Sequence, residues 1–176
     1  MDDVGQIATN PTYKGVPFLL ILNEHGGTKK VSLARKTIPG SLIIRPDYNN
    51  VGIKSLGNIE RINGDLGICD APIQDLGKLT KVKGDLWFTR YDNHLRLESL
   101  KPVVEIGGNL VLNDDKITSL DTIESVKGNL NLRKSSIKDL GALKYIGGNF
   151  LGRRKVFQDF DFSNIEILGK IRLYKE

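Results

Sequence analysis

Two aspartates, Asp65 and Asp85, occupy equivalent places, each directly after a glycine that opens the same short pattern of alternating apolar residues. If that pattern is a strand and successive strands are neighbours, the two carboxyl groups lie about 4.8 Å apart. A carboxylate pair near that separation can hydrolyse glycosides with retention of configuration. Later copies have Asn109, Asn129 and Asn149 at this position, and Asp and Asn both suit turns by bonding to their own backbone. We therefore expect a turn role here and no catalytic residue.

No other group of side chains points to catalysis or to a bound metal. His25 and His94 are far apart in the sequence, and NDDK at Asn113 lacks the spacing of a calcium-binding loop. Cys69 has no histidine near it in the sequence, which argues against a catalytic cysteine–histidine pair. The paired glycines belong to a repeat and not to a phosphate-binding loop. We therefore expect a protein that is not an enzyme and that holds no cofactor and no metal.

A unit of about 20 residues repeats along the chain, and such a period decides the fold. Each unit reads glycine, Asp or Asn, Leu-x-Leu, four further residues, then Ile-x-x-Leu-x-x-Ile-x-x-Val or a close variant. In two units, four extra residues follow the Leu-x-Leu segment. The glycines that open the units are 20 to 24 residues apart: Gly40, Gly64, Gly84, Gly108, Gly128, Gly148 and Gly169.

The spacing of apolar residues changes within each unit, and this change predicts its structure. Leu-x-Leu has the period of a short β-strand. The later apolar residues recur every three positions, which is too close for an α-helix and is typical of a 3₁₀-helix or an extended turn. One unit cannot bury both stretches alone, but stacked units bury them against one another. We therefore predict a mainly β protein, a right-handed parallel solenoid of about seven coils with one parallel sheet.

The two ends of the chain depart from the repeat. Residues 16–22 and 31–34 flank the sequence NEHGGTKK, which is typical of a β-hairpin with a Gly-Gly turn. We assign residues 1–39 to an N-terminal β-hairpin cap and residues 40–176 to the repeat solenoid, within a single domain overall. In the unit from Gly148, Gly152 replaces an inward apolar residue. We expect the phenylalanines that follow to fill the space it leaves: Phe157, Phe160 and Phe162.

The strands GDLGI, GNLVL and GNLNL, followed by IQDL, ITSL and IKDL, resemble the units of short leucine-rich repeats. They are equally similar to the coils of receptor L domains and to GGNL-type repeats of bacterial and phage proteins. The likeness covers about residues 40–173, without the regular asparagine of long leucine-rich repeats and without L-domain cysteines. It implies a leucine-rich-repeat-like scaffold. Such scaffolds host many functions, and the resemblance suggests a bacterial or phage-encoded inhibitor or adaptor.

Residues between the inward ones of each strand point outward and form columns across the predicted sheet. The second column places Trp87 near aliphatic residues, which is unusual for a face that meets only water, although the cap or a loop could also cover this tryptophan. Aromatic residues near arginine are typical of binding hot spots. We therefore predict that a partner binds this face. The contacts predicted from this column and the next are Trp87, Val111, Asn131, Leu151, Arg133, Arg153, Arg172 and Tyr174.

The two four-residue insertions each offer a tyrosine, Tyr48 and Tyr91, with Asn and Asp nearby. Both insertions should emerge from the same edge of the solenoid. Insertions in repeat proteins commonly lie on the binding side, but neutral loop growth explains them equally well. We include both tyrosines among the predicted partner contacts.

Basic residues gather toward the C-terminal end, around Arg133, Arg153 and Arg172, in a chain of net charge +5. Such a cluster can hold phosphate or an acidic protein surface. Aromatic residues are not interleaved along it, as the stacking of single-stranded nucleic acid would require. The function that we predict first is a protein-binding scaffold. The alternatives are weak nucleic-acid binding through the basic end, and a solenoid that binds or cleaves glycans.

The composition is that of a globular protein, with 39% hydrophobic and 27% charged residues among 176. One cysteine, Cys69, fits a reducing compartment. The first ten residues show no signal-peptide pattern, and the longest apolar run, 16–22, is too short to cross a membrane. We therefore expect a cytoplasmic protein without a membrane partner. Charge on the edge of the last strand leads us to expect a monomer or a closed dimer.

Overall fold

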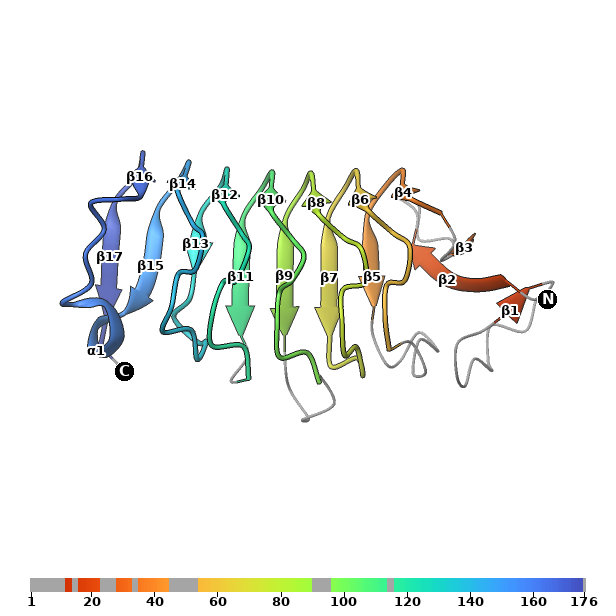
Figure 1. Cartoon of the computed structure of the whole chain (residues 1–176), viewed down its shortest axis with the longest axis horizontal. Helices are drawn as coiled ribbons and strands as arrows, with labels where there is room; N and C mark the ends of the chain where they lie inside the picture. Colours follow the sequence, from red (N-terminus) through yellow and green to blue (C-terminus); the bar gives the residue numbers. More distant parts are fainter. Residues whose placement is uncertain are drawn as a thin grey trace.

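In the computed structural model, the chain forms a stack of similar coils with a small antiparallel sheet at its N-terminal end (Figure 1). The structure describes residues 12–13, 16–22, 28–32, 35–44, 54–89, 96–113 and 116–175. Within these ranges nearly all regular structure is β, and α1 (Arg154–Phe157) is the single helix. The predicted mainly β, parallel solenoid is confirmed.

Seven parallel strands form one face of the stack, and we refer to them as the long-strand sheet. Neighbouring strands pair exactly one repeat unit apart, so that Leu110 faces Leu86 on one side and Leu130 on the other. Seven strands correspond to six complete turns of the chain, close to the prediction of about seven coils. The strands are β5 (Leu42–Ile44), β7 (Leu66–Cys69), β9 (Leu86–Thr89), β11 (Leu110–Asn113), β13 (Leu130–Asn131), β15 (Phe150–Arg153) and β17 (Ile171–Tyr174).

A second seven-stranded parallel sheet precedes the glycine turn of each unit, so the prediction of one sheet is wrong. The last two residues before that turn are extended, and their backbone pairs with the neighbouring coil. The hydrogen bonding continues beyond the strand, where the Lys83 N–H donates to the Ile62 backbone oxygen at 2.9 Å. The three-residue spacing therefore belongs to extended turns, and no 3₁₀-helix occurs in the described ranges. This short-strand sheet contains β4 (Thr37–Ile38), β6 (Arg61–Ile62), β8 (Lys81–Val82), β10 (Glu105–Ile106), β12 (Ser125–Val126), β14 (Tyr145–Ile146) and β16 (Glu166–Ile167).

The apolar positions of the repeat fill the inside of the coil. In the unit from Gly64, the residues Leu66, Ile68, Ile73 and Leu76 have no exposed surface, and neither do the equivalent residues of the next two units. Burial of one such side chain contributes about 1.5–3 kcal/mol. Because each residue is covered by the coils before and after it, the contacts between coils stabilise the fold.

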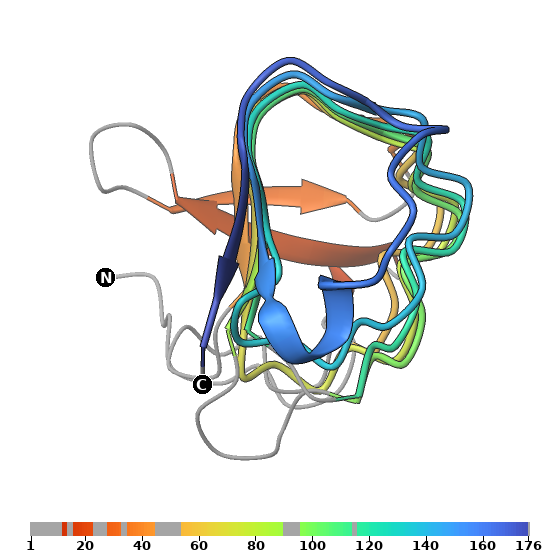
Figure 2. The ribbon, with the colours of Figure 1, turned by 90° about the vertical axis from the view of Figure 1, so that its left-hand side faces the viewer.

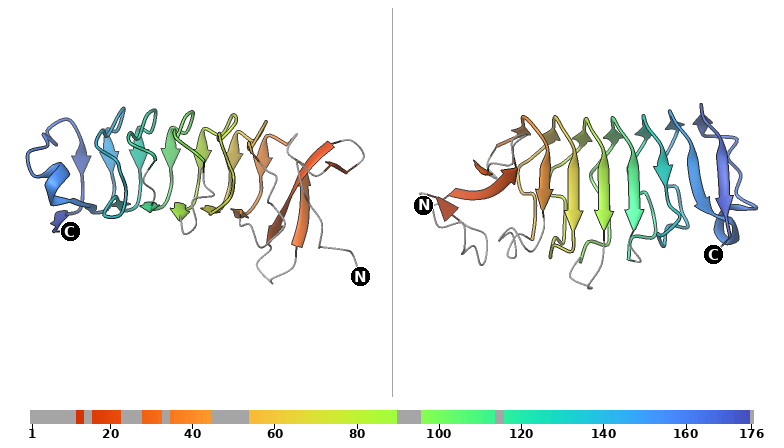
Figure 3. Two further views of the ribbon diagram at one scale, coloured as in Figure 1. Left: turned by 90° about the horizontal axis from the view of Figure 1, so that it is seen from below. Right: turned by 180° about the vertical axis from the view of Figure 1, so that it is seen from behind.

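The N-terminal sheet consists of β1 (Thr12–Tyr13), β2 (Val16–Leu22) and β3 (Thr28–Ser32), paired antiparallel. β2 packs against β5, and β2 and β3 run across the direction of the solenoid strands (Figure 2, Figure 3). The predicted hairpin is thus confirmed, with its second arm at 28–32 where we predicted 31–34. The predicted Gly-Gly turn, Gly26 and Gly27, lies outside the described residues.

Phenylalanine rings fill the last coils of the stack. A Cβ atom added at Gly152 would lie 2.6 Å from the Phe150 ring and 2.8 Å from the Phe157 ring. These two rings meet edge to face with their centres 5.0 Å apart. Phe162 packs on Phe150 at 4.9 Å, and Phe160 packs on Phe157 at 5.8 Å. The prediction that aromatic residues occupy the space left by Gly152 is confirmed.

The Asp and Asn residues that follow the glycines form a hydrogen-bonded ladder along the stack. The Oδ1 atom of each accepts a hydrogen bond from the backbone N–H of the equivalent residue in the next coil, at 2.8 Å both for Asp65 with Asp85 and for Asn129 with Asn149. The side-chain amide of Asn149 also donates to Asn129 Oδ1 at 2.9 Å. The expectation that these side chains bond to their own backbone is wrong, because they satisfy the backbone of the neighbouring coil.

Asn129→Ala is expected to lower the free energy of unfolding by about 1–3 kcal/mol, because the partly buried N–H of Asn149 loses its acceptor. Asn129→Asp keeps an acceptor oxygen in place, as Asp65 and Asp85 do in their coils, and should cost less. Urea unfolding of the three proteins measures the difference. Equal losses in the two variants would show that the hydrogen bond to Asn149 contributes nothing.

Candidate binding surface

The second outward column of the long-strand sheet lies as the sequence predicts. Strand register places Val111 between Trp87 and Asn131, and it places Leu151 between Asn131 and Arg172. Arg172 is exposed, and the other four side chains are half-buried. Strands β9 to β17 therefore present these residues on successive coils of one face.

Trp87 lies against a glycine of the neighbouring coil. Gly67 is its register partner in β7, and a Cβ atom there would lie 2.4 Å from Cζ2 of the indole. The indole therefore lies across the buried backbone of Gly67. Trp87 thus packs on the preceding coil and also keeps part of its surface open to solvent.

A shallow hollow opens on this face over the C-terminal half of the stack, and we refer to it as the strand-face hollow. Asp85 and the ladder asparagines Asn109, Asn129 and Asn149 form part of its lining. Stacking brings together residues that lie far apart in the sequence. Six of the predicted partner contacts line it: Val111, Asn131, Arg133, Leu151, Arg172 and Tyr174.

Two arginines give the strand-face hollow a positive charge. The guanidinium carbon of Arg133 lies 4.9 Å from the centre of the Tyr174 ring, and its Nε donates to Asn131 Oδ1 at 3.2 Å. A cation over an aromatic ring is stabilised by about 0.5–1 kcal/mol at an exposed site. Arg172 forms no ion pair within the part of the chain that the structure describes. The hollow therefore offers hydrogen-bond donors around aliphatic side chains.

The other four predicted contacts do not line the strand-face hollow. Trp87 is in register with Val111, which does line it. Arg153 is in register with Tyr174 on the same sheet. Tyr48 and Tyr91 lie outside the described residues.

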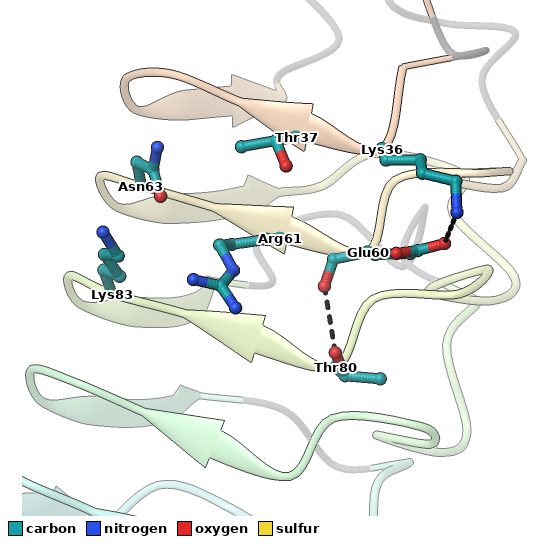
Figure 4. A pocket seen from close by; sticks show the side chains of 7 residues that line it. All are labelled: Lys36, Thr37, Glu60, Arg61, Asn63, Thr80 and Lys83. Carbon is teal, nitrogen blue, oxygen red and sulfur yellow. Dashed lines mark hydrogen bonds and ion pairs between the residues drawn. The ribbon is translucent and has the colours of Figure 1, made fainter.

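A second hollow lies on the short-strand sheet and was not predicted from the sequence (Figure 4). We refer to it as the basic hollow. Its charged residues come from the segment before the first unit and from the first two units, so no run of basic residues marks it. One signal in the sequence could have indicated it: Arg61 and Lys81 occupy equivalent positions one unit apart. The equivalent positions two residues later hold Asn63 and Lys83. The lining residues are Lys36, Thr37, Glu60, Arg61, Asn63, Thr80 and Lys83.

Carboxylates in and near the basic hollow are paired with lysines. Glu60 Oε1 lies 3.0 Å from Lys36 Nζ. Glu105 accepts from Lys81 Nζ at 2.5 Å and lies 2.9 Å from Lys127 Nζ. The hydrogen bonds from Lys81 and Lys127 hold the pKa of Glu105 below its ordinary value. These carboxylates therefore neutralise Lys36, Lys81 and Lys127, and not Arg61 or Lys83.

The aspartates that could have formed a catalytic pair belong to the ladder. Asp65 Oδ1 accepts from the backbone of Asp85, and Asp85 Oδ1 accepts from the N–H of Asn109 at 2.6 Å and from its side-chain amide at 3.0 Å. The geometry thus gives both carboxylates a structural role. In the described ranges, no three His, Cys, Asp or Glu side chains lie together as a metal ion would need. No helix in those ranges has the length and apolar character that crossing a membrane requires.

Comparison with protein-family models gives no match, and no curated protein or solved structure is significantly similar to the chain. The repeat and the two hollows are therefore the basis on which a function can be inferred.

Proposed function

We propose that the protein is a protein-binding repeat scaffold that recognises its partner through the strand-face hollow. The observation that supports this most directly is that five residues from four units line one surface: Val111, Leu151, Arg133, Arg172 and Tyr174. Aromatic and arginine side chains around an apolar centre have the composition of binding hot spots. The partner then presents an acidic side chain flanked by apolar residues.

The side chains that line the strand-face hollow are already held in place, which favours binding. Arg133 already contacts the Tyr174 ring and Asn131, so it has less conformational freedom to lose when a partner binds. Val111 and Leu151 lie on regular strands, which keep their side chains at a constant spacing. A carboxylate that meets a guanidinium can form two parallel hydrogen bonds, which gives specificity as well as affinity.

We also propose that the scaffold is leucine-rich-repeat-like. A role as a bacterial or phage-encoded inhibitor or adaptor in the cytoplasm rests on the resemblance of the repeat to such units and on the single cysteine. Neither the strand-face hollow nor the ladder depends on this assignment.

The test is affinity capture from lysate of the source cells with quantitative mass spectrometry, followed by calorimetry with the purified partner. Arg172→Glu should weaken partner binding by about tenfold or more, because it reverses an exposed charge in the strand-face hollow. Lys138→Glu makes the same change of charge at an exposed lysine outside both hollows and should leave binding unchanged. Equal binding by Arg172→Glu and the unmodified protein would exclude this face as the interface.

Nucleic-acid binding through the basic end is the second candidate. The exposed Arg154 and Lys155 of α1 lie at the same end of the stack as Arg172 in β17 (Figure 1). Because this cluster is small, it reaches few phosphates. Its binding to nucleic acid should therefore be non-specific and should weaken steeply as the salt concentration rises. Sub-micromolar affinity for a defined DNA or RNA at about 0.15 M salt would favour this candidate over a protein partner.

A further inference from the structure

Arg61 and Lys83 place two like charges in the basic hollow. Arg61 lies in β6 and Lys83 directly follows β8, on the neighbouring coil, and paired strands are about 4.8 Å apart. Both side chains are exposed, and neither forms an ion pair within the described residues. The register partner of Arg61 is Lys81, so Lys83 lies diagonally across from Arg61, two residues farther along the chain. An anion bound between Arg61 and Lys83 would meet two cations that no carboxylate of the described residues neutralises.

The carboxylate that lines the basic hollow is paired with Lys36 and not with Arg61 or Lys83. Glu60 accepts from Lys36 Nζ at 3.0 Å, and its backbone oxygen accepts from Thr80 Oγ1 at 3.1 Å. In Figure 4 the Glu60 side chain is directed toward Lys36, whereas the guanidinium of Arg61 extends away from both. The lining holds Lys36, Arg61 and Lys83 against Glu60, which leaves a net charge of +2 (three positive, one negative).

We propose that the basic hollow binds a tetrahedral oxyanion, a phosphate or sulfate group, between Arg61 and Lys83. A guanidinium can donate two parallel hydrogen bonds to such a group, and an ammonium adds a compact charge. The hydroxyl of Thr37 and the side-chain amide of Asn63 line the same hollow and add neutral donors. Donors from three successive coils thus surround one small site.

A single anionic group suits the basic hollow better than a long polyanion does. Farther along the short-strand sheet, Lys81 and Lys127 are both paired with Glu105, so the unpaired cations Arg61 and Lys83 do not continue as a row along the stack. The proposal does not rest on the function proposed above, because the strand-face hollow lies on the other sheet. The oxyanion is either a free ion or a group carried by a larger ligand.

The experiment is a titration of the ¹⁵N-labelled full chain with inorganic phosphate and, separately, with phenyl phosphate. Sodium chloride holds the ionic strength constant. The amide signals of Arg61, Asn63 and Lys83 should shift and saturate. Arg61→Gln and Lys83→Gln should each weaken phosphate binding by about tenfold or more.

The matched control is the double variant Lys54→Gln/Lys138→Gln, which removes two exposed lysines outside the basic hollow and should bind phosphate normally. Phenyl phosphate that binds at least as tightly as inorganic phosphate indicates a group carried by a larger ligand. Weaker binding of phenyl phosphate indicates a free ion. Shifts that do not saturate, that chloride alone reproduces, or that persist unchanged in Arg61→Gln overturn the proposal.

A second measurement uses stability. A ligand that binds the folded state raises its melting temperature. Sulfate, compared with chloride at equal ionic strength, should therefore raise the melting temperature of the unmodified protein more than that of the double variant Arg61→Gln/Lys83→Gln. An equal rise in both proteins would overturn the proposed site.

Discussion

Replacing Phe157 with alanine should lower the free energy of unfolding by about 3–5 kcal/mol. The Phe157 side chain is 1% exposed, and its ring meets Phe150 edge to face at 5.0 Å. Its removal leaves a cavity beside Gly152, which has no side chain to fill it. The four-residue helix α1 is too short to be stable alone, so loss of this ring also removes its attachment to the stack.

Phe160→Ala is the matched control, because it removes a half-buried ring from the same cluster and should cost less. Urea unfolding measures both losses. Amide hydrogen exchange in β15 and β17 should show that the last coils open first in the Phe157 variant, since a stack depends on contacts between neighbouring coils. Losses of equal size in the two variants would contradict the cavity argument.

Replacing Gly77 with alanine should destabilise the stack through two separate effects. Gly77 has a φ of 60°, where a side chain costs about 1–2 kcal/mol. A Cβ atom there would also lie 2.4 Å from the backbone oxygen of Gly57 in the preceding coil. Because a backbone atom cannot rotate away as a side chain can, the overpacking should add about 1–3 kcal/mol.

Gly40→Ala is the control for this prediction, because nothing lies within 4 Å of a Cβ atom at Gly40 and its backbone is not left-handed. Its free energy of unfolding should change little. Gly77→Asn separates the two effects, since asparagine tolerates a left-handed backbone but retains the clash; Asp121 adopts a φ of 51° at the equivalent turn. If thermal and urea unfolding show the same stability for Gly77→Ala and Gly40→Ala, neither effect operates.

The inward positions of the coils could be predicted from the sequence because the repeat states them several times. Leu110, Leu112 and Ile117 were assigned inward by the two spacings within one unit, and all three are fully buried. The period also predicted the in-register column from Trp87 to Arg172, since residues one unit apart must be neighbours when identical units stack. The missing side chain at Gly152 predicted that aromatic rings would fill its place.

The second sheet and the ladder were not predicted, because backbone hydrogen bonds between coils leave little trace in residue types. Two-residue strands such as Glu105–Ile106 are too short to show a strand period. The choice of Asp or Asn after each glycine is compatible with a local turn as well as with a bond to the next coil. The structure distinguishes the two, because the Oδ1 atoms lie at hydrogen-bond distance from the backbone N–H groups of the next coil.

The sequence by itself determined that this protein is a stack of coils, which residues fill it and which columns face outward. The tertiary structure decided which outward residues lie together. Val111, Arg133 and Tyr174 share a hollow, whereas Arg153 on the same sheet does not line it. Arg61 and Lys83 share another, although their units show no basic motif. The physical reason is that spacing along the chain sets the face of a residue, whereas packing between coils sets the direction and the neighbours of its side chain.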